Sequence, residues 1–268
     1  MHIMHLMPNF VQQMAGLFDG ELRTLELPPP EKELMPGVHW GAFDELLTPA
    51  FWAGRAWLHS TDPSFLHCRL GRSLKEEVAA CLLGGYGIPA EVGLAAYREL
   101  RDRDLLGGTP SPQEIQVVLT SPLKVGGRLV RYRFARQKAE YLSDCLRCLG
   151  EMNLPTEDQA FRDALTSLPG IGMKTASWIT RNMRGSDRVA ILDVHICRAC
   201  SVIGVFPKKA EPAKDYRALE TRFLEFAGAV STRASLLDSV MWHVMRRIGS
   251  ALARRVNNTS VATPELVA

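Results

Sequence analysis

The sequence predicts a mainly α-helical fold, and three observations support this class. Apolar residues recur every three or four positions in several stretches after residue 73, for example at Leu236, Val240, Val244 and Ile248. Helix-capping patterns stand at the starts of several of these stretches. The expected helices dominate the chain, which leaves little room for a large sheet.

Composition and charge narrow the class of protein. The 268 residues are 46% hydrophobic and 23% charged, as in an ordinary soluble globular protein. The net charge is only +3, so a nucleic-acid face would have to come from local clustering of basic residues. No apolar run reaches the roughly 18 residues of a membrane span, and the first residues lack the pattern of a signal peptide. We therefore expect a cytoplasmic protein without a membrane partner.

The chain divides into three segments by pattern. Residues 1–70 form an irregular N-terminal segment, broken at Pro28–Pro30, which we expect to pack on the core and to hold short strands. Residues 71–255 carry the helical domain, and residues 256–268 form a flexible tail. We expect capping boxes at Ser73 with Glu76 and at Thr156 with Gln159. The helices are expected at about 73–83, 89–103, 111–119, 136–149, 156–167, 173–183, 193–202, 213–227 and 232–255.

Two Cys-X-X-Cys pairs raise the question of a metal site. Cys145 and Cys148 form one pair, and Cys197 and Cys200 form the other. Structural zinc sites place such pairs on turns, whereas both pairs here fall within helical patterns. We favour buried thiols over metal ligands, since buried cysteine acts as a small hydrophobic residue.

A basic segment precedes the expected helix 136–149. Six basic residues and no acid occur between Lys124 and Lys138, and Gly126-Gly127 is typical of a hairpin turn. Tyr132 and Phe134 alternate with the arginines, a mixture suited to phosphate contacts beside a base-stacking ring. A solvated basic hairpin without function is the alternative interpretation.

The stretch from Leu168 to Asp193 carries most of the functional information. Leu168-Pro-Gly-Ile-Gly172 joins two short helices, and its glycines allow a sharp turn and a close approach of a partner. The free amides and the positive dipole end of the second helix then form a phosphate site. The sequence thus predicts a helix-hairpin-helix, which grips the DNA backbone without reading the base sequence.

Lys174 and Asp193 are the candidate catalytic residues. Lys174 lies in the first turn of the second helix, whose positive end disfavours the ammonium form and favours a free amine nucleophile. Residues 184–192 are long enough to return Asp193 towards the lysine, and Asp193 is placed to cap the next helix. A lysine that only contacts phosphate and an aspartate that only caps a helix are the alternatives.

These motifs resemble the helix-hairpin-helix DNA glycosylase superfamily. Leu168–Lys174 (LPGIGMK), followed 19 residues after its lysine by the aspartate of AILDVHICR, is similar to the bifunctional 8-oxoguanine DNA glycosylase/AP lyases. The resemblance runs from about residue 74 to residue 248 and leaves out residues 1–60. The four cluster cysteines of endonuclease III relatives are absent after Cys200, and adenine-specific mismatch glycosylases lack the lysine.

The resemblance implies a fold and a set of site residues. The fold is a two-lobed helical glycosylase with the DNA cleft between the lobes. Asp238 would hydrogen-bond the flipped base and Trp242 would stack on it; their i, i+4 spacing puts both on one helix face. Phe134 is a weaker candidate for the opposite ring, and Tyr86 is a candidate for filling the vacated base stack. The backbone contacts would be Gly170, Gly172, His195 and Arg136.

The implied function is base-excision repair of damaged double-stranded DNA by a monomer associated with the nucleoid. Lys174 would expel 8-oxoguanine and form a Schiff base, and Asp193 would stabilise positive charge on the sugar. No cofactor is expected, although carbonyls near Leu168 and Ile171 would hold a non-catalytic monovalent or calcium ion. This chain lacks the base-contacting C-terminal lysine of the subfamily. A glycosylase for another damaged base and a non-catalytic DNA-binding module therefore stay open as alternatives.

Overall fold

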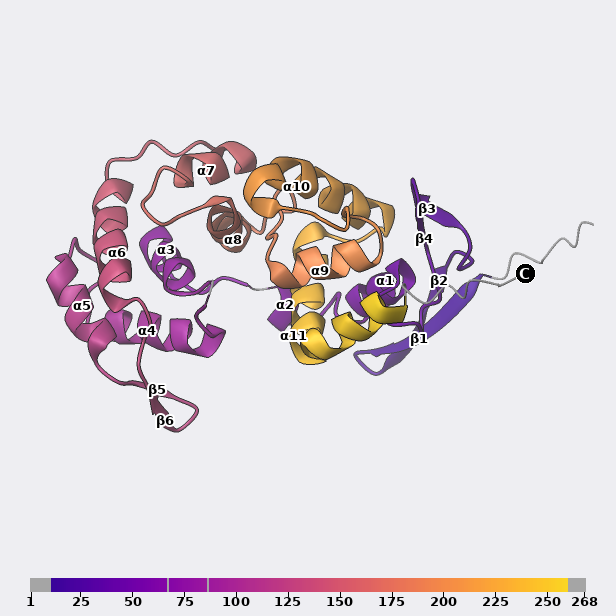
Figure 1. The fold of residues 1–268 in the computed structure, drawn as a ribbon, viewed down its shortest axis with the longest axis horizontal. Helices are drawn as coiled ribbons and strands as arrows, with labels where there is room; N and C mark the ends of the chain where they lie inside the picture. Colours follow the sequence, from indigo (N-terminus) through magenta and orange to yellow (C-terminus); the bar gives the residue numbers. More distant parts are fainter. Residues whose placement is uncertain (1–10, 67, 86, 260–268) are drawn as a thin grey trace, which may run out of the picture. The chain divides into compact units, whose positions relative to one another are not determined.

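The computed structural model describes residues 11–66, 68–85 and 87–259, so Tyr86 lies outside the described residues. Eleven helices and six short strands occur in this part of the chain, which confirms the mainly α class (Figure 1). The chain forms two compact units, residues 67–191 and residues 1–66 with 192–268. The N-terminal segment therefore belongs to the same unit as the C-terminal helices. No helix of the described residues is both long and apolar enough to cross a membrane.

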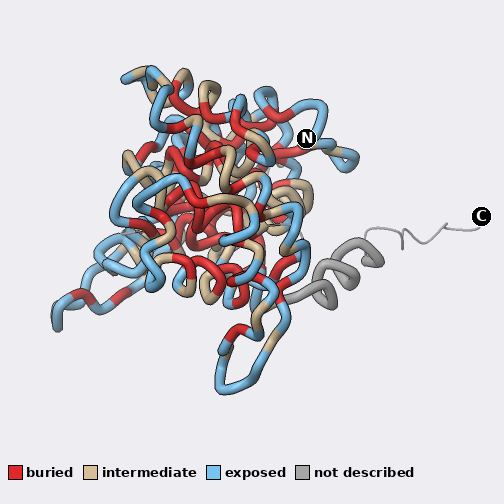
Figure 2. Tube along the Cα trace, turned by 90° about the vertical axis from the view of Figure 1, so that its left-hand side faces the viewer, coloured by how far each residue is buried: buried red, intermediate tan, exposed pale blue. Residues whose placement is uncertain are grey.

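The unit of residues 67–191 is built from helices and one small hairpin. Its apolar core contains Leu83, Leu100, Leu119, Leu142 and Ile179, all fully buried. Buried and exposed stretches alternate along the chain trace, as amphipathic helices require (Figure 2). The elements are α3 (Leu74–Leu83), α4 (Ala90–Asp102), α5 (Pro112–Thr120), β5 (Leu123–Val125), β6 (Arg128–Val130), α6 (Ala135–Leu149), α7 (Asp158–Leu165) and α8 (Met173–Arg184).

The other unit combines three helices after residue 192 with the N-terminal segment. Strands β1 (Gln12–Phe18) and β2 (Glu21–Leu27) pair antiparallel around an Asp19-Gly20 turn, in which both residues have positive φ, as a tight hairpin requires. Phe18 of this hairpin packs edge-on against Trp57, at 4.8 Å between ring centroids. The elements are β1 (Gln12–Phe18), β2 (Glu21–Leu27), β3 (Glu33–Met35), β4 (Val38–His39), α1 (Pro49–Leu58), α2 (Pro63–Leu66), α9 (Val194–Val202), α10 (Pro212–Ala229) and α11 (Ala234–Thr259).

The structure differs from both capping boxes expected at helix starts. Ser73 caps α3 by accepting from the amide of Glu76, but the Glu76 carboxylate accepts from Arg72 and not from Ser73. Helix α7 is capped by Glu157, which accepts from the amide of Ala160, so the box expected at Thr156 is wrong. Gln159 donates instead to the carbonyl of Arg188. At the other end of the chain, α11 extends four residues beyond the expected boundary at residue 255.

A buried carboxylate ties α8 to α3. Glu77 is fully buried and accepts hydrogen bonds from the amides of Leu70 and Gly71 at 2.9 and 2.7 Å. It also accepts from Nδ2 of Asn182 in α8 at 2.6 Å. A buried charge needs such partners, because each oxygen has lost its water. Glu77 thereby fixes the position of α8 on the core.

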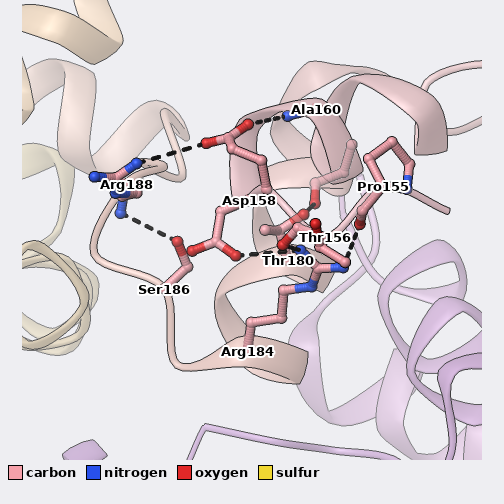
Figure 3. Close-up of polar contacts among 10 residues, drawn as sticks. Pro155, Thr156, Asp158, Ala160, Thr180, Arg184, Ser186 and Arg188 are labelled. Carbon is pink, nitrogen blue, oxygen red and sulfur yellow. Dashed lines mark hydrogen bonds and ion pairs between the residues drawn. The ribbon is translucent and has the colours of Figure 1, made fainter.

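Arg184 closes the helix-hairpin-helix at the far end of α8. Its guanidinium donates to the carbonyls of Pro155 and Thr156, at 2.7 and 2.6 Å, and pairs with Asp158 at 3.3 Å (Figure 3). It also lies over the ring of Phe161, at 3.8 Å from the centroid. The last turn of α8 is therefore held against the start of α7.

Arg184→Met should destabilise this unit, because two carbonyls and a carboxylate lose a charged donor. We expect the free energy of unfolding to fall by about 2 kcal/mol, the scale of hydrogen bonds to charged groups. Urea denaturation of both variants measures it, with Arg188→Met as the matched control. Arg188 is exposed and pairs with Glu157 only at 3.8 Å, so its loss should cost at most about 0.5 kcal/mol. Equal losses of unfolding free energy in the two variants would contradict the role of Arg184 in holding α8 against α7.

Candidate functional site

The turn between α7 and α8 has the geometry expected of a helix-hairpin-helix. Gly170 has φ +73°, and a Cβ there would collide with the ring of Tyr141. Gly170 is therefore required by both backbone conformation and packing. A Cβ at Gly172 would meet nothing within 4 Å, so this glycine leaves open space beside the turn.

The start of α8 is suited to bind an anion. Gly172 is the N-cap and offers no side-chain acceptor to the amides of the first turn. These amides carry the positive end of the helix dipole, so a phosphate is a favourable partner. The carbonyl of Leu168 accepts from the amide of Ile171 at 3.1 Å and keeps a second lone pair that an ion could use.

Lys174 lies in the first turn of α8 and is half-buried. Its Nζ is 6.0 Å from the centroid of the Trp178 ring. A Cβ built on Gly85 would lie 3.7 Å from this Nζ, so the amine is next to the loop that follows α3. Trp178 itself packs close to Gly84. The lysine is thus held between an aromatic ring and a glycine loop.

The basic segment forms the hairpin of β5 and β6, with Gly126-Gly127 at its tip as predicted. Phe134 is 43% exposed, adopts the left-handed conformation with φ +67°, and lies under the guanidinium of Arg133 at 4.8 Å. Arg136 is exposed, with an ion pair to Glu140 at 3.1 Å. Tyr132 is buried and donates to the carbonyl of Leu83, so a stacking role for Tyr132 is wrong.

In the other unit, Asp193 caps α9 as predicted. Its Oδ1 accepts from the amides of His195 and Ile196, at 2.8 and 3.0 Å. These bonds hold one carboxylate oxygen in place. His195 follows in the first turn of α9, and its buried Nδ1 has no hydrogen-bond partner among the described residues. A buried polar atom of this kind calls for an explanation, such as a bound water or a ligand.

Asp238 and Trp242 lie one turn apart in α11 of the same unit. Asp238 is buried, and its charge contributes to raising the pKa of the Cys200 thiol, after burial and Cys197. Trp242 is half-buried, with the ring of His195 edge-on at 6.4 Å. The guanidinium of Arg246 lies over the Trp242 ring at 5.1 Å. His195, Asp238 and Trp242 thus gather on two packed helices, α9 and α11.

The cysteine pairs lie on helices, as expected. Cys145 and Cys148 are in α6, and Cys197 and Cys200 are in α9. Burial raises the pKa of Cys145 and of Cys197 to about 12, which keeps both thiols protonated. Within residues 11–66, 68–85 and 87–259, no group of three His, Cys, Asp or Glu side chains is placed to hold a metal ion.

Two contacts around the candidate residues were not predicted. Lys138 reaches the end of α3 and lies near Lys174, although the sequence indicates only that it ends a basic run. Arg246 covers Trp242, and its i, i+4 spacing in the last helix is a signal that could have found it.

Comparison with known proteins yields a consistent set of relatives. A curated 8-oxoguanine DNA glycosylase/AP lyase of Metallosphaera sedula is 32% identical over 131 residues, covering 47% of this chain. The match spans 62% of that relative, less than two thirds of its length.

Solved structures show the same fold. The 8-oxoguanine DNA glycosylase of Methanocaldococcus jannaschii has a TM-score of 0.56 at 24% identity, covering 72% of this chain and 92% of that chain. That of Thermotoga maritima has a TM-score of 0.55 at 21% identity, covering 73% and 96%. The M. jannaschii enzyme in complex with a 15mer DNA containing 8-oxoguanine has a TM-score of 0.52 at 23% identity, covering 72% and 96%.

The family comparison covers both the hairpin and the capping aspartate. The matching family is described as Ogg-HhH, 8-oxoguanine DNA glycosylase, and its match runs over residues 68–232, more than half of the chain. The chain therefore belongs to the Ogg-HhH family of 8-oxoguanine DNA glycosylases.

Proposed function

We propose that this protein is a DNA glycosylase with AP lyase activity that removes 8-oxoguanine from double-stranded DNA. The observation that carries the proposal is the position of Lys174, a half-buried amine in the first turn of the hairpin's second helix. A phosphate held by the amides of that turn would bring a DNA strand to this amine. Family membership and the M. sedula relative's AP lyase activity support the same reaction.

Lys174 is the proposed nucleophile. The damaged nucleotide first leaves the base stack, since the sugar carbon is otherwise out of reach. The Nζ lone pair attacks C1′, and the bond from C1′ to the base breaks, with its electron pair leaving on the base. Loss of a proton from nitrogen and opening of the sugar give a Schiff base. Removal of a proton from C2′ then expels the 3′ phosphate and cuts the strand.

Asp193 is the proposed carboxylate of the reaction. Its two backbone hydrogen bonds fix one oxygen and leave the other for charge developing on the sugar. The same carboxylate would accept a proton from the lysine ammonium. No step is assigned to the ion expected at the hairpin carbonyls.

The proposed base site consists of Asp238 and Trp242, with Phe134 as a further stacking ring. Trp242 offers an aromatic face one helical turn from a carboxylate, which suits a purine that is stacked and hydrogen-bonded. His195, Gly170, Gly172 and Arg136 are the proposed backbone contacts. The orphaned Nδ1 of His195 supports its contact with the DNA. We further propose that the protein acts as a monomer on nucleoid DNA.

The range of substrates tests the proposal. Single-turnover excision should be compared on duplexes that carry 8-oxoguanine, uracil, alkylated adenine or thymine glycol. The proposal requires 8-oxoguanine to be removed fastest. Faster removal of another lesion would make the protein a glycosylase for that damaged base. Binding to the duplexes without excision of any of the four lesions would indicate a DNA-binding module.

Lys174→Gln should abolish the covalent intermediate, because glutamine has no nucleophilic amine. With borohydride present, the wild-type protein should form a trapped adduct with lesion-containing duplex, and the variant should form none. Strand cleavage should fall by at least about a thousandfold, as expected for loss of a covalent nucleophile. Cleavage at the wild-type rate in the variant would remove Lys174 from the mechanism.

Asp193→Asn separates the charge of Asp193 from its capping role, since asparagine also caps helices. We expect excision to fall by about a hundredfold or more, the scale of losing a preorganised electrostatic group, while DNA affinity and thermal stability stay close to wild type. Fluorescence anisotropy and single-turnover assays measure the two effects. Normal excision in this variant would make Asp193 a helix cap alone.

Trp242→Ala should affect base removal more than strand cleavage. Stacking on an aromatic side chain contributes about 1–3 kcal/mol per base, so excision of 8-oxoguanine should slow by about tenfold to a hundredfold. A duplex with a preformed abasic site needs no base pocket, and its cleavage rate should be retained. Equal losses on both substrates would place Trp242 outside the base site.

A further inference from the structure

The β5–β6 hairpin carries cations that no acidic residue offsets. The whole chain has 32 Lys or Arg against 29 Asp or Glu, yet the sequence between Glu114 and Glu140 contains six basic residues and no acid. Lys124 in β5, Arg128 in β6 and Arg131 directly after β6 are exposed. None of these three side chains forms a hydrogen bond or an ion pair with a residue that the structure describes.

Other exposed arginines of the same unit do have acidic partners. Arg103 pairs with Glu99 at 3.5 Å, and Arg147 pairs with Asp144 at 2.9 Å. A solvated basic surface would show such pairs as well, because the chain is nearly balanced in charge. Neighbouring cations without counter-charges repel one another, so the hairpin is suited to a polyanion.

The base of the β5–β6 hairpin is anchored in the unit of residues 67–191. Leu123 is 1% exposed, lies in the apolar core and pairs across the hairpin with Val130. The hydroxyl of Tyr132 donates to the carbonyl of Leu83 at 2.7 Å, which ties the chain after β6 to the end of α3. Beyond these anchors, the hairpin extends away from the helices of its unit to the turn at Gly126-Gly127 (Figure 1).

The loop after α3 connects this hairpin with the proposed nucleophile. A Cβ on Gly87 would lie 3.7 Å from the ring of Phe134 and 3.8 Å from a guanidinium nitrogen of Arg133. A Cβ on Gly85 would lie 3.7 Å from Nζ of Lys174. A duplex whose damaged nucleotide is at Lys174 therefore lies next to the segment that leaves the β5–β6 hairpin.

One face of the hairpin combines a cation with an apolar side chain. Lys124 and Leu129 are direct partners across the two strands. Side chains alternate between the faces of a strand, so both lie on the face opposite the buried Leu123. Leu129 is 72% exposed. An apolar side chain between cations suits the sugar–phosphate backbone of DNA, where phosphates alternate with less polar sugars.

We propose that the β5–β6 hairpin is a second DNA contact, which binds the duplex that flanks the damaged nucleotide. Lys124, Arg128 and Arg131 bind phosphates, and Leu129 lies against the sugars between them. This inference rests on the proposed function in that damaged DNA is the substrate. The contact adds affinity for the flanking duplex without reading its sequence.

Binding to an undamaged duplex tests the proposal without any need for excision. The affinity of wild type and of Lys124→Gln/Arg128→Gln/Arg131→Gln should be measured by fluorescence anisotropy between about 50 and 200 mM salt. Each lost phosphate contact should reduce the slope of log affinity against log salt by about 0.9, so the triple variant should lose about 2.7. Its affinity at the lowest salt should fall at least about tenfold.

A matched control removes the same charge from other surfaces. Arg103→Gln/Arg147→Gln/Lys214→Gln also removes three exposed cations, each of which pairs with a carboxylate. This variant should keep the wild-type slope. An equal loss of slope in both triple variants would overturn the proposal, because net charge alone would then explain the binding.

The role of Leu129 has a different signature. Leu129→Ala should lower the affinity by about tenfold, the scale of burying a leucine side chain, and should leave the salt slope unchanged because no counterion is involved. Wild-type affinity in this variant would overturn the placement of Leu129 against the DNA.

A second measurement uses the unmodified protein and so does not depend on the folding of a variant. Acetylation by acetic anhydride, followed by mass spectrometry, should be compared with and without saturating undamaged duplex. The duplex should protect Lys124 but not Lys214. Equal acetylation of Lys124 in both conditions would overturn the contact and leave the hairpin to another kind of partner, such as an acidic protein surface.

These outcomes are separable from the proposed function. If the duplex protects Lys124 and the salt slope falls as expected, but no lesion is excised, the DNA contact stands and the proposed function fails. If lesions are excised while the slope and the protection are unaffected, the proposed function stands and the hairpin contact fails.

Discussion

The buried carboxylate of Glu77 is the interaction on which the position of the site depends. It accepts from Asn182 in α8 while it holds the segment before α3, so the two helices cannot slide past one another without leaving a charge unpaired. Lys174 lies two turns before Asn182 on the same helix. The amine therefore reaches the α3 terminus because α8 is fixed along its length. Arg184 extends this constraint to α7, and with it to the hairpin turn.

The hairpin turn and Lys174 both lie at the N-terminal end of α8. The glycine N-cap leaves the amides of the first turn available to a phosphate, and Lys174 lies in that same turn. The proposed phosphate contact and the proposed nucleophile therefore lie at one helix end. The opposite helix end, at the C-terminus of α3, supplies the carbonyl that holds Lys138.

Much of this arrangement was predictable, because it depends on local signals. The Leu168–Gly172 turn, the Asp193 cap and the Gly126-Gly127 hairpin follow from glycine and capping chemistry, and the structure confirms all three. The predictions were wrong where tertiary contacts determine the burial of a side chain or the start of a helix. Tyr132 resembled a stacking ring, yet packing buries it against α3, and α7 begins at a Glu157 cap that propensity ranks below Thr156. The neighbourhood of Lys138 and Lys174 joins residues 36 positions apart, which no local pattern encodes.

Identification of the residue that becomes covalently attached to DNA tests the central claim most directly. Wild-type protein would be trapped with borohydride on an 8-oxoguanine duplex, digested, and the modified peptide sequenced by mass spectrometry. The account predicts a single reduced adduct on Lys174, within the peptide that contains the Leu168–Gly172 turn. An adduct on Lys138, on another lysine or on the N-terminal amine would contradict it, because the nucleophile would then lie outside the first turn of α8.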